Sequence, residues 1–322
     1  MAVTGPVTEV IRAAGDHVPG LLARVENRLA GLAGGHGATL AEHAGSTIAA
    51  GGKRLRPLLV FLAADDASGE GLVRAATAVE LVHSATLVHD DVLDAAALRR
   101  GVPTVWASAG RGAAVATGDL LFARAFAELA RNGRVDEIRV LSGASCALAE
   151  GELRQRADAW DAAVPVDRYL ERCELKTARL FEAACRLGAL ESGGDTDALG
   201  AFGRRIGLAF QLLDDVLDVS GPASRTGKHR GTDLLDGTVT LPYILARERD
   251  PELAALDPRT IRDPDEAERV CDRIEATGAL DEARRRALAI VDGAKARLPG
   301  ALPGRQRAAL DLVANGVVAR YA

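Results

Sequence analysis

Two copies of one carboxylate motif, Asp90–Asp94 and Asp214–Asp218, most constrain how this chain can fold. Both copies read Asp-Asp-Val-Leu-Asp and lie in apolar stretches with helical periodicity. On a helix the first and last Asp share one face, and like charges there cost about 0.2–0.5 kcal/mol. Apolar surroundings add a desolvation cost unless a cation binds. The motifs therefore predict two clusters on separate helices that face one cavity, hold divalent metal and so bind a diphosphate.

The composition excludes several classes of protein. The net charge is −5 and the charges are interspersed, so no nucleic-acid partner is expected. No uncharged apolar stretch reaches the ~20 residues of a transmembrane helix, and the start of the chain does not resemble a signal peptide. The four cysteines lack metal-ligand spacing and are typical of buried thiols in a reducing compartment. We therefore expect a cytoplasmic protein without an integral membrane segment.

Helical periodicity covers most of the chain, and no segment alternates as a strand would. Glycine and proline separate the helices, but no linker divides the chain. Segments 71–94 and 195–219 are apolar nearly all round, which predicts central helices covered by others. The pattern predicts an all-α fold, a large single-domain helical bundle spanning residues 1–322. The predicted helices are 7–32, 38–50, 54–66, 71–94, 113–131, 135–156, 166–189, 195–219, 238–249, 265–276, 279–297 and 303–321.

Two basic clusters accompany the acidic motifs. The turn 51–57 places Lys53 and Arg56 near a predicted helix start, where backbone N–H groups and cations favour phosphate. A solvated basic turn has the same pattern. Arg99 and Arg100 follow the first motif closely and suit the outer oxygens of a diphosphate. A salt bridge to the Asp cluster itself is the alternative for this pair.

Two histidines lie on the same predicted helix as the first motif. His83 and His89 show neither the HExxH nor the paired ExxH spacing, so a zinc or di-iron site is not indicated. A buried histidine whose ring nitrogens are hydrogen-bonded within the core is the commoner interpretation of either residue. The loop after the second motif is basic and rich in glycine, which suits closure over an anion but is also common in soluble loops.

With these residues in hand, the chain resembles the trans-isoprenyl diphosphate synthases, also called polyprenyl synthetases. The resemblance runs in the same order from about Gly51 to Pro242. It includes GGKRLRP, HSATLVHDDVLD, LRRG, PTVW, TGDLLFARAF, GELRQ, LKTARLFEAACRLGAL, FQLLDDVLD and GTDLLDGTVTLP. This ordered set is highly specific. It implies an all-helical fold of the isoprenoid synthase type with a central cavity, three Mg²⁺ ions and a homodimer.

The resemblance also implies a role for individual residues. The metal for the allylic diphosphate would be held by Asp90, Asp94 and Asp214, supported by Asp91, Asp215 and Asp218. The allylic diphosphate would be gripped by Arg99, Lys176 and Lys228. Isopentenyl diphosphate would be bound by Lys53, Arg56, His83 and Arg100. Further polar contacts in the cavity would come from Thr177 and Gln211. The predicted catalytic residues are Asp90, Asp94, Asp214, Lys176 and Arg99.

The implied reaction is a head-to-tail condensation of isopentenyl diphosphate with an allylic diphosphate, which makes the chain a prenyltransferase. Ala85 and Thr86, one turn before Asp90, are small where short-chain relatives usually carry aromatics. We therefore predict an open tunnel and a medium- or long-chain all-trans product, with Phe122 or Phe126 as a floor further along. Geranylgeranyl or farnesyl diphosphate remains the alternative, because a floor elsewhere would also stop growth.

The chain departs from the family pattern at two places. Thr238 stands where a lysine is usual, which removes one cation from the diphosphate clamp, and Arg225 or Arg230 could compensate. Ala95–Ala97 stands where an acidic residue is common. A class I terpene cyclase is the rival enzyme, although its second metal site normally mixes Asn, Ser and Glu. A non-catalytic regulatory subunit would be expected to have lost its Asp motifs, and a purely structural bundle leaves the ordered motifs unexplained.

Overall fold

The computed structural model describes residues 6–33, 37–49, 52, 54–221 and 229–319. Most of the described chain is helical, which confirms the all-α prediction. The chain groups into two compact units, each built from separate stretches. Unit 1 comprises Met1–Ser145, Leu180–Gly203 and Leu298–Leu312, and unit 2 comprises Cys146–Arg179, Arg204–Arg297 and Val313–Ala322. That the whole chain forms one domain stays a prediction.

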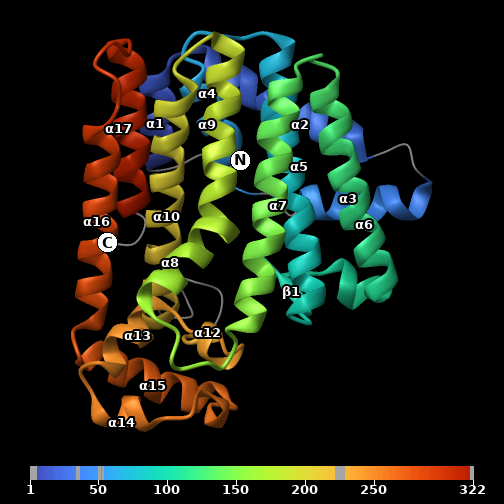
Figure 1. The fold of residues 1–322 in the computed structure, drawn as a ribbon. Helices are drawn as coiled ribbons and strands as arrows, with labels where there is room; N and C mark the ends of the chain where they lie inside the picture. The colour runs from blue at the N-terminus through green and yellow to red at the C-terminus, as the bar shows by residue number, and fades with distance from the viewer. Residues whose placement is uncertain (1–5, 34–36, 50–51, 53, 222–228, 320–322) are drawn as a thin grey trace. The chain divides into compact units, whose positions relative to one another are not determined.

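Unit 1 is organised around a long helix pair. Helices α5 (Glu70–Leu93) and α6 (Val105–Ala130) pack side by side (Figure 1). Around α5 lie α2 (His17–Ala33), α3 (Ala38–Ala49) and α4 (Leu55–Ala63), and α1 (Pro6–Ala14) precedes them. Among the described helices, α5 is long and apolar enough to cross a membrane by length and composition alone. However, 72 % of its most apolar stretch is buried inside the protein. This burial is what the sequence predicted for a central helix.

Unit 2 collects shorter helices around α13 (Leu241–Arg247), which packs against several of them. These neighbours are α8 (Val166–Cys173), α14 (Pro251–Ala255), α15 (Pro264–Ala276) and α16 (Ala279–Ala296). A π-helical turn, η1 (Glu174–Ala178), joins α8 to α9 (Arg179–Ser192). The remaining short elements are α12 (Thr232–Leu235) and the 3₁₀ turn η2 (Pro258–Thr260). Both units include residues of α7 (Val135–Ala157), α9, α10 (Thr196–Ser220) and α17 (Gly304–Ala319).

The structure differs from the predicted elements at positions where local backbone geometry determines the secondary structure. A short antiparallel hairpin consists of β1 (Leu98–Arg99) and β2 (Val102–Pro103). Strands of two residues are too short to produce an alternating sequence pattern. The N-cap Thr104 starts α6 earlier than predicted, because its side chain accepts a hydrogen bond from the Ala107 N–H. The prediction of four buried thiols is wrong at Cys146, which is exposed.

Unit 1 contains a close backbone contact that only glycine permits. A Cβ atom on Gly188 of α9 would lie 2.1 Å from the Val60 carbonyl oxygen of α4. Neither backbone can move without disturbing the buried residues around it, since Leu59, Val60 and Leu187 are fully buried.

We predict that Gly188→Ala lowers the free energy of unfolding by about 1–3 kcal/mol, because the added methyl group overpacks this contact. Chemical denaturation measures the change. Gly20→Ala is the control, since no atom lies within 4 Å of its built Cβ, and it should stabilise α2 by ~0.5–1 kcal/mol. Equal effects of the two substitutions would contradict the packing described here.

A buried carboxyl group and a half-buried one lie together elsewhere in unit 1. Glu137 of α7 is fully buried and accepts a hydrogen bond of 2.8 Å from the Asn132 amide. Burial, followed by a hydrogen bond with Glu191 and its charge, raises the pKa of Glu137 to about 8, although Asn132 and Arg134 oppose the shift. With its pKa raised to about 8, Glu137 keeps a proton at neutral pH.

This pair predicts a pH-dependent stability. Because the folded-state pKa of Glu137 lies near 8 and its ordinary value is 4.5, the folded protein holds a proton that the unfolded chain releases. Stability is therefore lost as pH rises between these values. Glu137→Gln mimics the protonated form and should flatten this fall in Tm between pH 5 and 9. The control Asp136→Asn, which changes an exposed neighbouring carboxylate, should retain the wild-type slope; an unchanged slope in Glu137→Gln would refute the assignment.

Candidate active site

The first Asp motif occupies the last turn of α5 and directs its carboxylates differently. Asp91 is buried, and its Oδ1 accepts a hydrogen bond from Nε of Arg99 and forms an ion pair with Nη2 of the same residue, each at 2.7 Å. Asp90 is half-buried and Asp94 is exposed at the C-terminus of the helix. Asp91 is thus held against the hairpin, whereas Asp90 and Asp94 lie one helical turn apart on another, accessible face.

The second Asp motif has the same organisation in unit 2. Asp215 is buried, and its two oxygens accept hydrogen bonds of 2.6 Å from the Tyr169 hydroxyl and 2.7 Å from the Gln211 amide. Asp214 is exposed. Burial and the charge of Asp214 raise the pKa of Asp215 to about 7, although the two hydrogen bonds and Arg172 oppose the shift. In both motifs the second Asp is buried and hydrogen-bonded within its own unit, and the first is accessible.

Asp218, the last residue of the second motif, contributes to the loop that follows it. Its Oδ2 accepts a hydrogen bond from the Asp233 N–H at 3.1 Å, and its carbonyl accepts one from the Gly231 N–H. Its side chain therefore holds the start of α12 against the end of α10.

The donor groups suit a hard divalent cation, because all are carboxylate oxygens and several are accessible. The residues that fit a magnesium ion best are Asp90 and Asp94 in unit 1 and Asp214 in unit 2. Within the part of the chain that the structure describes, no group of three or more His, Cys, Asp or Glu residues stands close enough to hold a metal by itself. The meeting of the two motifs around shared metal therefore stays a prediction.

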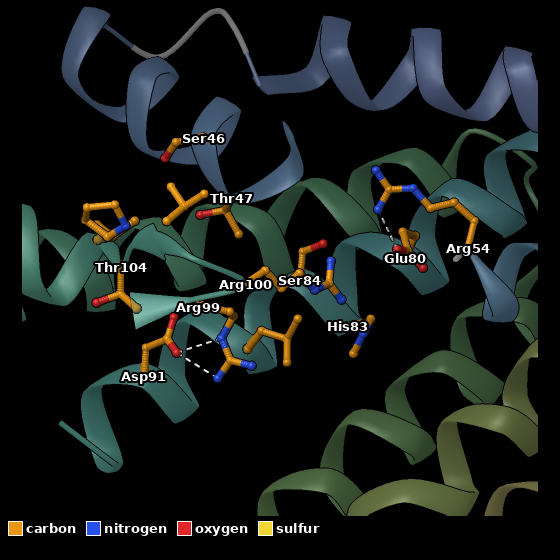
Figure 2. Close-up of a pocket in the computed structure, with 14 residues that line it drawn as sticks. Ser46, Thr47, Arg54, Glu80, His83, Ser84, Asp91, Arg99, Arg100 and Thr104 are labelled. Atoms are coloured by element: carbon orange, nitrogen blue, oxygen red, sulfur yellow. Dashed lines mark hydrogen bonds and ion pairs between the residues drawn. The ribbon is translucent and has the colours of Figure 1, made fainter. Parts of the chain in front are cut away.

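Unit 1 contains a basic pocket between α3, α5 and the hairpin. Figure 2 shows Arg100 and His83 projecting into it and Arg99 turned toward Asp91. The structure thus brings together three residues predicted to bind diphosphates. Its other lining residues are Ser46, Thr47, Arg54, Glu80, Ser84, Leu87, Asp91, Val102, Pro103, Thr104 and Val105.

The charge in this pocket depends on a buried anion that the sequence analysis missed. Glu80 is 4 % exposed and accepts a hydrogen bond of 2.7 Å from Arg54, which also binds Glu26. Burial, followed by the charges of Arg56 and Arg100, lowers the pKa of His83 well below its ordinary value. His83 is therefore a neutral hydrogen-bonding group at physiological pH. The available signal was Glu80 itself, one helical turn before His83.

Two of the pocket arginines have unusual backbone geometry. Arg54 has φ 47° at the N-terminus of α4, and Arg100 has φ 54° in the turn between β1 and β2. In Arg100-Gly101 both residues have positive φ, as a tight hairpin turn requires. A non-glycine residue in this region is strained, and such strain concentrates at functional sites.

The other predicted residues of this cluster are placed differently. Arg56 lies with its guanidinium over the Phe181 ring at 4.9 Å, and its Nε has no hydrogen-bond partner among the described residues. Burial lowers the pKa of Arg56 to about 10, although the charge of Glu80 opposes the shift. Lys53 and Lys228 lie outside the described residues.

Lys176 lies in the π-helical turn of unit 2. Its Nζ is 2.5 Å from Oε2 of Glu152, and a Cβ on Gly151 would lie 2.5 Å from the Lys176 backbone nitrogen. Burial works to raise the pKa of Glu152, but Lys176 and Arg156 outweigh it and lower the value. The next residue, Thr177, donates a hydrogen bond of 2.6 Å to the Gln211 amide oxygen. Thr177 and Gln211, both predicted to make polar contacts in the cavity, are therefore bonded to each other. The structure also shows that Glu152 binds Lys176, which the sequence did not predict.

Arg225 and Arg230 are the two residues that could compensate for the lysine usually found at the position of Thr238. Arg230 is committed to α15 and α10, since it donates to Asp272 at 2.8 Å and to the Val219 carbonyl. That Arg230 replaces the lysine stays a prediction. Arg225 lies outside the described residues.

The candidate chain-length residues divide by exposure. Ala85 is fully buried, whereas Thr86 is half-buried and shares a helix face with Asp90. Phe122 and Phe126 are half-buried on α6, and the Phe122 ring lies 5.9 Å from the His89 ring. Thr86 is thus better placed than Ala85 to border an open path that begins at the motif.

Comparison with known proteins gives one consistent assignment. The profile of the polyprenyl synthetase family matches residues 38–276. The chain is 40 % identical over 268 residues to heptaprenyl diphosphate synthase component 2 of Geobacillus stearothermophilus, covering 81 % of this chain and 83 % of that protein. It is 37 % identical over 262 residues to geranylgeranyl diphosphate synthase of Methanosarcina mazei, covering 77 % and 80 %. The crystal structure of a polyprenyl synthase from Caulobacter crescentus, complexed with calcium and isoprenyl diphosphate, is similar with a TM-score of 0.89, 36 % identity and 98 % coverage of both chains.

Proposed function

Because the chain belongs to the polyprenyl synthetase family, whose members are prenyltransferases, we propose that it condenses isopentenyl diphosphate with an allylic diphosphate in head-to-tail (1′-4) fashion. The products are an all-trans prenyl diphosphate longer by one unit and pyrophosphate. The observation that supports this most directly is the shared organisation of the two Asp motifs. Each motif combines an accessible first carboxylate with a buried, hydrogen-bonded second one.

The acidic and the basic residues have separate proposed roles. Asp90, Asp94 and Asp214 would hold Mg²⁺, three ions in all, and bound Mg²⁺ supplies Lewis-acid stabilisation of the departing diphosphate. Arg99 and Lys176 add positive charge that favours the separated diphosphate. Each of them is held by a carboxylate, Asp91 or Glu152, so its position is fixed before substrate arrives.

The basic pocket of unit 1 is the proposed site for isopentenyl diphosphate. Arg100 and His83 project into it and can donate hydrogen bonds to phosphate oxygens. Glu80, which also lines the pocket, holds Arg54 by a hydrogen bond. The isopentenyl double bond attacks the allylic carbon, and the released diphosphate accepts the proton that the product loses.

We propose a medium- or long-chain product, of the hexaprenyl to decaprenyl class. The absence of an aromatic ring at Thr86, on the face of Asp90, supports it, as does the similarity to a heptaprenyl diphosphate synthase component. Geranylgeranyl diphosphate is the second candidate, because a relative of that activity is nearly as similar. The two differ in product length and not in the reaction.

We further propose a cytoplasmic homodimer that acts without a second protein. The name "component 2" of the Geobacillus relative favours a different candidate, a subunit that needs a partner. Purified chain that elongates substrate alone, with the mass of a dimer by light scattering, would support the homodimer. Activity that appears only with a second protein would overturn it.

Loss of an accessible Asp should abolish turnover. We predict that Asp90→Ala and Asp214→Ala each lower kcat by about 100-fold or more, because the carboxylates that hold the metal are removed. Radiolabelled isopentenyl diphosphate incorporation with Mg²⁺ measures this, and circular dichroism shows whether the fold survives. Asp197→Ala removes a carboxylate that is 89 % exposed and serves as the control. Near-normal rates in both motif variants would show that the ligands are misassigned; hydrocarbon released from allylic diphosphate alone would identify a cyclase.

A ring at the start of the tunnel should shorten the product. We predict that Thr86→Phe, and with more disturbance the buried Ala85→Phe, shifts the product distribution to shorter chains, because the ring blocks the growing tail. Mass spectrometry of the products from farnesyl and isopentenyl diphosphates measures the shift. Thr86→Ala leaves the path open and should keep the wild-type product length. The same distribution from Thr86→Phe and Thr86→Ala would exclude a tunnel at this position.

A further inference from the structure

Tyr169 of α8 is buried beside the second Asp motif, and the reaction described above gives it no role. Its ring is fully buried, and its hydroxyl donates a hydrogen bond of 2.6 Å to Oδ2 of Asp215. Arg172 lies over the ring at 5.5 Å and donates to the Val239 carbonyl. The ring is therefore fixed in position, and so is the direction of the hydroxyl.

Tyr169 belongs to a continuous hydrogen-bonded chain between α8–η1 and α10. Thr177 donates to the Gln211 amide oxygen at 2.6 Å, and the Gln211 amide nitrogen donates to Oδ1 of Asp215 at 2.7 Å. Tyr169 completes the chain by binding the other oxygen of the same carboxylate. Both oxygens of Asp215 are thus held by groups whose orientation is itself fixed.

The π-helical turn explains how one helix reaches α10 at two points. Tyr169 and Thr177 are eight residues apart, a separation that in a regular α-helix turns the second side chain about 80° away from the first. The turn Glu174–Ala178 closes with a bond from the Arg179 N–H to the Glu174 carbonyl, five residues back. A π turn takes up one extra residue, so the two side chains align as residues seven apart would in an α-helix. The same turn carries Lys176, whose ammonium binds Glu152.

We propose that Tyr169 is a positioning residue for the second Asp motif: its hydroxyl, with Gln211, fixes the Asp215 carboxylate and thereby the orientation of Asp214 toward bound divalent metal. This inference rests on the proposed function. Through the π turn, the same helix fixes Lys176, so α8 and η1 set a diphosphate-binding cation and the metal-binding motif relative to each other within unit 2. Groups that orient metal ligands in this way commonly change metal affinity about 10- to 100-fold when removed.

The chain offers a matched control for the test. Tyr243 of α13 is also fully buried in unit 2, but its hydroxyl has no hydrogen-bond partner among the described residues. Tyr169→Phe and Tyr243→Phe therefore each remove a hydroxyl oxygen from a buried ring. Of the two hydroxyl groups, that of Tyr169 is hydrogen-bonded to Asp215 of the second Asp motif. Thermal unfolding of both variants establishes that they are folded at the assay temperature.

The experiment measures metal-dependent binding as well as activity. Calorimetric titration of the full chain with inorganic pyrophosphate, at a series of Mg²⁺ concentrations, reports binding without turnover. We expect Tyr169→Phe to raise the Mg²⁺ concentration needed for half-maximal binding and for half-maximal activity by about 10-fold or more, while kcat recovers at high Mg²⁺. Tyr243→Phe should match the wild type. Equal behaviour of the two variants would overturn the inference.

A double-mutant cycle tests whether Tyr169 acts through Asp215. Asp215→Ala removes both carboxylate oxygens that Tyr169 and Gln211 bind, and it should itself weaken Mg²⁺-dependent binding. In that background Tyr169→Phe should add little, because coupled residues are not additive. Fully additive effects would show that Tyr169 works by another route. A wild-type chain that binds pyrophosphate but elongates no allylic diphosphate would refute the proposed function and leave the positioning role standing.

Discussion

Two neighbouring carboxylates on an apolar helix point about 100° apart, and this geometry decides how the second residue of each motif is stabilised. A buried carboxylate is costly unless it is paired or hydrogen-bonded. The structure meets this requirement separately in each unit, with Arg99 for Asp91 and with Tyr169 and Gln211 for Asp215. The buried residue then anchors the end of its helix, so the accessible Asp beside it has a defined direction. Removing the anchor would free the ligand.

The cations follow a related arrangement. Arg54 is held by Glu80, Arg99 by Asp91 and Lys176 by Glu152. Each positive charge thus has a carboxylate partner without substrate, which limits repulsion between neighbouring cations. A diphosphate carries more charge than one carboxylate and can compete for the same donors. The carboxylates therefore hold these donors in place for an incoming anion.

Sequence reasoning predicted the long elements well, because their periodicity extends over many turns. It placed the central helix 71–94 within a residue of the observed α5. It missed the hairpin 98–103 and the π turn at Glu174–Ala178, since both depend on backbone geometry at a few residues and not on a repeating pattern. It also joined α1 to α2, although Gly15 with φ 113° separates them. These omissions matter, because the hairpin carries Arg99 and Arg100 and the π turn carries Lys176.

The candidate site shows the same division between pattern and contact. The six Asp residues and most of the basic residues could be selected from their spacing and their resemblance to a family. Glu80, Glu152 and Tyr169 could not, because their importance lies in which side chain each one touches across helices. Spacing also gave Asp91 and Asp215 the same standing as their neighbours. The fold shows which carboxylate of each motif faces the interior, namely Asp91 and Asp215.

The proposed reaction requires accessible carboxylates from both motifs to hold the same group of divalent cations around a diphosphate. Anomalous diffraction from crystals grown with Mn²⁺ and a non-reactive allylic thiodiphosphate would test it most directly. We expect Mn²⁺ peaks within coordination distance of Asp90, Asp94 and Asp214, bridged by the diphosphate, with Asp215 still bonded to Tyr169. Peaks at only one motif, or a diphosphate bound without metal, would contradict it.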